Sequence, residues 1–159
     1  MRRTLILAIA TLSAGLLFAC GSQPQTPQQQ KQGQQGIPPM GKPVVEAPEA
    51  VKGKWTAVVV LVEDKGTKKT EEHTIKLGEK LTLPGSNMTI EAKEFFPSFL
   101  MQGSTITSAS NETNNPAALV VVNDGGAEIF NGWLFARYPT THAFTHPRYT
   151  LTLKEGVPK

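Results

Sequence analysis

The sequence has one cysteine, few aromatic residues and no apolar run long enough to cross a membrane. Cys20 is the only thiol in 159 residues, so no disulfide can form within the chain. The main apolar stretch, residues 5–17, is shorter than the roughly 20 residues that a transmembrane helix needs. A domain in this chain must therefore be stabilised by its apolar core alone.

A strong excess of charge is missing as well. The chain has 16 basic and 13 acidic residues, and 14 basic residues remain when Arg2 and Arg3 are set aside. The resulting difference of one charge provides no basic patch of the kind that binds nucleic acid. We therefore exclude nucleic acid as a partner.

The N-terminus has the pattern of a bacterial lipoprotein signal. Arg2 and Arg3 precede the apolar stretch, and the small residue Ala19 precedes Cys20. This pattern predicts a signal peptide over residues 1–19 and a lipidated, acylated Cys20 that attaches the protein to a membrane. Gly21 follows the cysteine, which by resemblance to Gram-negative sorting signals favours the outer membrane, with the rest of the chain in the periplasm.

Residues 20–51 predict a disordered Gln/Pro-rich tether. Residues 21–36 contain no large apolar side chain, and prolines interrupt residues 37–50 throughout. Such a composition cannot bury enough surface to offset the entropy of the chain. A Pro-rich recognition peptide is the alternative, but no PxxP motif with flanking basic residues supports it.

Residues 52–159 predict one all-β domain. Residues 55–63 and 117–122 are rich in Val, Leu and Ala on both faces, which is typical of central strands. Residues 88–96 alternate apolar and polar side chains, and residues 123–126 (NDGG) are a strong hairpin signal. About seven strands follow, consistent with a single antiparallel β-sandwich, with a small barrel as the alternative. The expected buried residues are Val58, Val60, Ile90, Val120, Val122 and Trp133.

The sequence gives only weak indications of catalytic groups or of a metal site. No serine has a G-x-S-x-G setting, and no phosphate-binding or dinucleotide-binding motif is present. His142 and His146 lie four residues apart, as metal ligands on a helix would, but Pro139 and Pro147 bracket them. Backbone hydrogen bonding in a long loop is the alternative for both. His73 is a third, isolated candidate on a polar strand.

The aromatic residues are a better indication of function. Residues 95–101 (FFPSFLM) predict an apolar loop, and residues 130–135 (FNGWLF) place three large rings around Gly132. A glycine within a strand indicates a bulge or a close backbone approach, so an apolar groove near Gly132 is one interpretation. Filling of the core is the other. We predict that a partner would contact Gly132, Trp133, Arg137, Tyr138, His142, His146 and Arg148. The loop that contains these histidines could equally serve only to close one end of the sandwich.

Four segments carry a family resemblance. They are NPAA (115–118), FxGWLF (130–135), Pro139 and HPxY (146–149). Together they resemble the domain of unknown function 2155 family of exported bacterial proteins over roughly residues 55–153. The resemblance implies no activity. We associate members of that family with cysteines in the domain and with an acidic residue before the His-Pro pair. This chain has no cysteine in the domain, and Thr145 stands at the acidic position.

A Phe-Pro loop, Ser108, Asn115-Pro116 and Asp124-Gly125-Gly126 follow one another before an aromatic-rich strand. This layout resembles, more weakly, the periplasmic domain of ResB-type cytochrome c synthesis proteins. Three function classes remain open. The first is a non-catalytic binding or accessory module for an envelope protein or a small ligand. The second is a haem- or metal-handling protein with haem or zinc as cofactor, and a role in c-type cytochrome maturation is one form of this class. The third is a cell-wall-acting enzyme, which only the predicted location supports.

Overall fold

The computed structural model describes residues 42–159, and every regular element in this range is a β-strand. The predicted signal peptide, Cys20 and most of the predicted tether lie outside the described residues. Within 42–159, no helix is long and apolar enough to span a membrane. The strands are β1 (Val44–Val45), β2 (Trp55–Asp64), β3 (Lys69–Lys76), β4 (Lys80–Thr82), β5 (Met88–Phe96), β6 (Phe99–Gln102), β7 (Thr105–Ser108), β8 (Ala117–Asp124), β9 (Ala127–Phe135) and β10 (Tyr149–Pro158).

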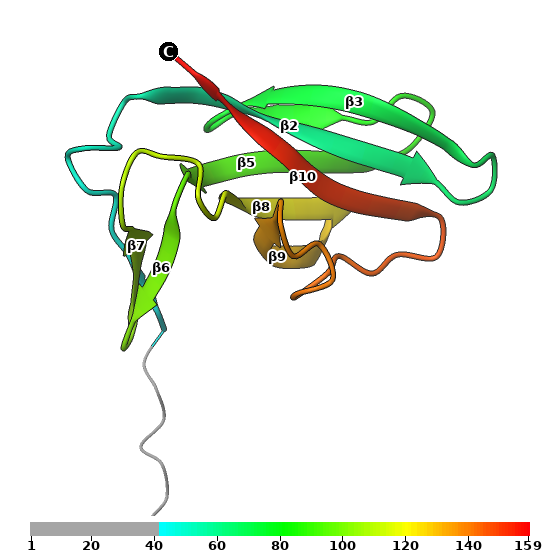
Figure 1. The fold of residues 1–159 in the computed structure, drawn as a ribbon. Coiled ribbons are helices and arrows are strands. Elements are labelled where there is room, and N and C mark those ends of the chain that lie inside the picture. The colour runs from blue at the N-terminus through cyan, green and yellow to red at the C-terminus, as the bar shows by residue number, and fades with distance from the viewer. Residues whose placement is uncertain (1–41) are drawn as a thin grey trace, which may run out of the picture. The chain divides into compact units, whose positions relative to one another are not determined.

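The strands form two principal sheets that make a β-sandwich (Figure 1). One sheet has the order β10-β2-β3 and the other has the order β4-β5-β8-β9, with all neighbours antiparallel. The Val-rich strands β2 and β8 are central in their sheets, as their two-sided apolar composition predicts. No sheet closes on itself, so the structure confirms the sandwich rather than the barrel alternative.

The core lies between these two sheets. Alternate residues of β2 and β8, namely Val58, Val60, Val120 and Val122, are fully buried, as is Ile90 of β5. The predicted burial of these five residues is therefore confirmed. Trp133 is the exception, because it is only partly buried. Its position in β9 points to the outer face of the sheet, while the neighbouring Leu134 points into the core.

A third, small sheet has the order β1-β7-β6. Residues 99–101 belong to this sheet, so the prediction of an apolar loop over residues 95–101 is wrong. Phe95 and Phe96 end β5, and Phe99 begins β6, which pairs with β7. The sheet buries a second apolar cluster of Val51, Phe96 and Ile106.

The folded region also begins earlier than residue 52. Val44 and Val45 pair in parallel with Thr105 and Ile106 of β7, and Val51 is only 4% exposed. Val44 and Val45 lie between prolines and show no local strand pattern. Their pairing depends on the β6–β7 hairpin, which lies about sixty residues further along the chain. Residues 44–51 are thus part of the domain rather than of the tether.

Candidate functional site

An apolar groove of about 530 Å³ lies between the outer face of β8 and β9 and the small sheet. Trp133 and Phe135 of β9 line the groove on one side, with Leu119 of the neighbouring strand β8. Phe99 and Met101 of β6, in the small sheet, also line the groove. The remaining lining residues are Pro43, Val45, Ile106, Asn131, Gly132, Thr141 and His142. The lining therefore combines side chains from strands that are distant in sequence.

Aromatic contacts hold the wall of this groove together. The Trp133 ring stacks on Phe96 with 5.2 Å between ring centroids and meets Phe99 edge-on at 5.0 Å. Phe99 in turn meets Phe135 edge-on at 4.9 Å. Edge-to-face and offset rings of this kind contribute about 0.5–1.5 kcal/mol per pair beyond the burial of their surface. The groove thus has an apolar wall whose rings are fixed by one another.

Gly132 lies in this wall within a regular stretch of β9. It pairs with Val120 in continuous register, and the bulge between β8 and β9 falls instead between Val122 and Asn123. The interpretation of Gly132 as a bulge is therefore wrong. A Cβ at position 132 would lie 3.0 Å from Cζ of Phe130, so the glycine accommodates the ring of a neighbour on its own strand.

His142 is the one residue with an ionisable side chain among those that line the groove. Its backbone has a φ of +52°, in the left-handed region that non-glycine residues adopt at a cost of about 1–2 kcal/mol. Its side chain is exposed. The structure thus places an accessible imidazole, on a backbone in the left-handed region, beside apolar and aromatic side chains.

His146 has a structural environment instead. Its Nδ1 atom accepts hydrogen bonds from the backbone N–H groups of Arg148 and Tyr149, each at 3.2 Å. Its Nε2 atom lies 3.6 Å from Oδ2 of Asp124, and its backbone carbonyl accepts a hydrogen bond from Nζ of Lys65 at 2.8 Å. These contacts fix the end of the loop that leads into β10. His146 does not line the groove.

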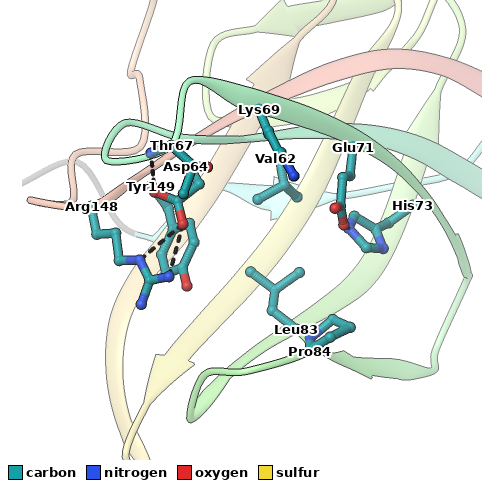
Figure 2. A pocket seen from close by; sticks show the side chains of 10 residues that line it. All are labelled: Val62, Asp64, Thr67, Lys69, Glu71, His73, Leu83, Pro84, Arg148 and Tyr149. Carbon is teal, nitrogen blue, oxygen red and sulfur yellow. Dashed lines mark hydrogen bonds and ion pairs between the residues drawn. The ribbon is translucent and has the colours of Figure 1, made fainter.

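Arg148 lies in a second, smaller pocket of about 110 Å³ (Figure 2). Its Nε and Nη2 atoms both donate to Oδ2 of Asp64, at 3.0 and 2.8 Å. The Arg148 hydrogen bond, followed by backbone N–H donors of Gly66 and Thr67, holds the pKa of Asp64 below its ordinary value of 3.8 despite opposing desolvation. The ion pair joins the last residue of β2 to the residue before β10, so the side chain of Arg148 has a structural role.

His73 lies in the same pocket, on β3 (Figure 2). Its Nε2 atom is 3.7 Å from a carboxylate oxygen of Glu71. Across residues 42–159, the structure contains no group of three or more His, Cys, Asp or Glu side chains able to hold a metal. The predicted metal candidates lie apart from one another. His142 lines the groove, His146 lies beside Asp124, and neither lines the pocket that contains His73.

The structure divides the predicted partner surface into separate places. Gly132, Trp133 and His142 line the groove. Arg137 donates a hydrogen bond from Nη2 to the carbonyl of Thr113 at 3.3 Å, and Tyr138 is 59% exposed without lining either pocket.

Sequence reasoning missed the part of the groove that the small sheet contributes. Phe99, Met101 and Ile106 were not assigned to strands, although Thr105-Ile106-Thr107 alternates polar and apolar residues as a half-buried strand does. This alternation is the local signal that could have placed a strand there. The part of the groove that the small sheet contributes depends on packing between strands that are distant in sequence.

The described chain is thus an all-β sandwich domain with an apolar groove on one outer face. It belongs to the family described as uncharacterized protein conserved in bacteria (DUF2155), whose family model matches residues 57–155 and so includes β6 to β9 of the groove. The family description names no catalytic activity. Comparisons with curated proteins and with solved structures gave no significant match.

Proposed function

We propose that this protein is a lipid-anchored envelope lipoprotein whose β domain is a non-catalytic binding or accessory module. The apolar groove beside Trp133 is the observation that supports this function. Its volume of about 530 Å³ falls within the roughly 300–1,000 Å³ typical of ligand pockets, and apolar side chains predominate in its lining.

The composition of the groove suits recognition. Aromatic rings supply large contact areas while losing little conformational entropy, and Met101 adds an adaptable, 55% exposed side chain. Exposed apolar surface of this kind marks interaction sites on soluble domains. A ligand or envelope partner with an apolar surface would therefore gain most of its affinity from Trp133, Phe99 and Met101.

The proposed anchor is the lipid on Cys20, and the proposed location is the periplasmic side of the outer membrane. The 24 residues from 20 to 43 would let the domain reach partners roughly 25 Å or more from the membrane surface. The basic start, the apolar stretch and the small residue before the cysteine support this assignment.

Haem handling is a second candidate function, because His142 lies beside apolar and aromatic side chains in the groove. Imidazole is a common axial ligand of haem iron, and apolar surroundings favour the porphyrin. Titration of the full chain with haemin tests this role. A Soret band that shifts with wild type but not with His142→Ala would support haem binding, and an unchanged spectrum would remove it.

Two matched substitutions test the binding function. Met101→Asp places a charge in the groove, whereas Ile129→Asp changes a 42% exposed apolar residue of β9 that does not line the groove. We expect Met101→Asp alone to weaken binding of the apolar dye anilinonaphthalenesulfonate and capture of partners from solubilised envelopes. Equal effects of both substitutions would contradict the groove as the binding surface. Release of soluble fragments from peptidoglycan by the wild-type chain would contradict the non-catalytic assignment.

A further inference from the structure

We propose that the apolar groove receives the segment Ile37–Met40 of the chain itself, so that the tether occupies the binding site of the free protein. The inference rests on the groove being the binding surface proposed above. It adds an occupant to that surface, and it implies that any partner must displace this occupant.

The first argument is where the described chain begins. Pro43 and Val45 themselves line the groove. The N–H of Val44 donates to the carbonyl of Ser104 at 2.8 Å, and the N–H of Glu46 donates to that of Ile106 at 2.9 Å. Strand β1 therefore holds the chain against the small sheet at the margin of the groove. Only Gly41 and Lys42 separate Met40 from the lining residue Pro43.

The second argument is the distribution of apolar residues before the domain. Residues 21–36 contain no large apolar side chain, whereas residues 37–40 are Ile-Pro-Pro-Met. An apolar tetrapeptide in a polar stretch gains free energy when it leaves water, at about 25 cal/mol per Å² of apolar surface. The apolar surface closest to it along the chain is the groove, because Pro43 is already part of the lining.

The third argument is the low cost of this contact. The prolines at 38 and 39 have a fixed φ and lose little backbone entropy on binding. Aromatic-lined grooves bind proline-containing segments in several protein families, and Trp133, Phe99 and Phe135 supply such rings here. A covalent link of two residues gives the segment a local concentration of about millimolar or more. The six residue-to-residue steps from Ile37 to Pro43 span at most about 20 Å, which limits the segment to the groove margin and its surroundings.

The test uses the full-length chain with Cys20→Ser, which removes the lipid from the measurement. The double variant Ile37→Ser/Met40→Ser removes the apolar side chains of the segment. Gln34→Ser/Gln35→Ser is the matched control, because it changes two residues of the same tether without changing its apolar content. Fluorescence of anilinonaphthalenesulfonate reports how much of the groove is open.

We expect the Ile37/Met40 variant to bind the dye at least threefold more strongly than the parent and the control variant. A synthetic peptide of residues 36–42 should reverse this increase, and Met101→Asp should abolish both the increase and its reversal. Equal dye binding in all tether variants, or an increase that the peptide does not reverse, would overturn the proposal. Protection that grows with protein concentration would also overturn it, since the segment would then come from a second copy.

This result is distinguishable from failure of the proposed function. If the tether variants have no effect while Met101→Asp still weakens partner capture and Ile129→Asp does not, the groove remains the binding surface. The proposal for residues 37–40 alone would then fail.

Discussion

Gly156 of β10 lies directly against the ring of Phe95 of β5, in the sheet that faces it. A Cβ at position 156 would lie 2.4 Å from both Cε1 and Cζ of that ring. Phe95 is 1% exposed and packs against Trp55 with 4.8 Å between ring centroids. The two sheets therefore meet here through a contact that only a residue without a side chain permits.

Gly156→Ala should therefore destabilise the domain. The added methyl group forces the buried ring or the strand to move, and overpacking of this kind costs about 1–3 kcal/mol. Urea unfolding followed by circular dichroism measures the change. Phe95→Leu should cost less in the Gly156→Ala background than in wild type, because the smaller side chain leaves room for the methyl group. Fully additive effects of the two substitutions would contradict a direct clash.

The parts of the fold that could be predicted are those specified by local patterns. Two-sided apolar composition identified β2 and β8 as central strands, because only a strand covered on both faces tolerates it. The β8–β9 hairpin was predicted from its turn residues. Gly125 and Gly126 adopt φ values of +57° and +90°, and a two-residue type I′ hairpin turn requires positive φ at both central residues.

The remaining features depend on contacts between distant residues. Strand β10 continues to Pro158 because Gly156 and Val157 pair with Val58 and Ala57 of β2. The small sheet joins residues 44–45 to residues 105–106. No periodicity within a short window reports such pairings. For the same reason, the β9 side of the groove could be expected from sequence, whereas its β6 side could not.

His146→Ala should destabilise the loop before β10. The substitution removes the Nδ1 acceptor of two backbone N–H groups, and a typical intramolecular hydrogen bond contributes about 0.5–1.5 kcal/mol. Hydrogen exchange of the amides of Arg148 and Tyr149 should accelerate. His142→Ala is the matched control, since it removes an exposed imidazole from the same loop. Similar acceleration of these amides in both variants would contradict this assignment.

The pair of Asp64 and Arg148 should make stability sensitive to acid. The folded-state pKa of Asp64 lies below 3.8, chiefly because Arg148 donates to its carboxylate. The folded state therefore binds fewer protons at this site than the unfolded chain, and stability falls as the pH decreases through the folded-state pKa. Between pH 5 and pH 2, Asp64→Asn should lose less stability than wild type. Thermal unfolding across that range, with the exposed Glu155→Gln as the control, measures the difference, and parallel profiles of Asp64→Asn and wild type would contradict it.

Cys20→Ser should release the protein from the membrane fraction into the soluble periplasmic fraction. The substitution removes the thiol that would take the lipid, and the described domain has no helix that could span a membrane. Fractionation of bacterial cells followed by immunoblotting measures the distribution. Ser22→Ala is a suitable control, because it changes a neighbouring residue and leaves the thiol in place. A Cys20→Ser protein that stays in the membrane fraction would show that the anchor is assigned wrongly.

Substitutions at His142 should affect stability through the backbone rather than through the exposed side chain. With a φ of +52°, this position disfavours β-branched residues most strongly, so His142→Val should cost about 1–2 kcal/mol. His142→Gly should remain within about 0.5 kcal/mol of wild type, because relief of the strained backbone offsets the greater entropy of the unfolded chain. Urea unfolding of both variants checks this order, and equal stabilities would contradict it. His142→Gly thus removes the imidazole from the groove without adding strain, which makes it the sharper companion to His142→Ala in the haemin titration.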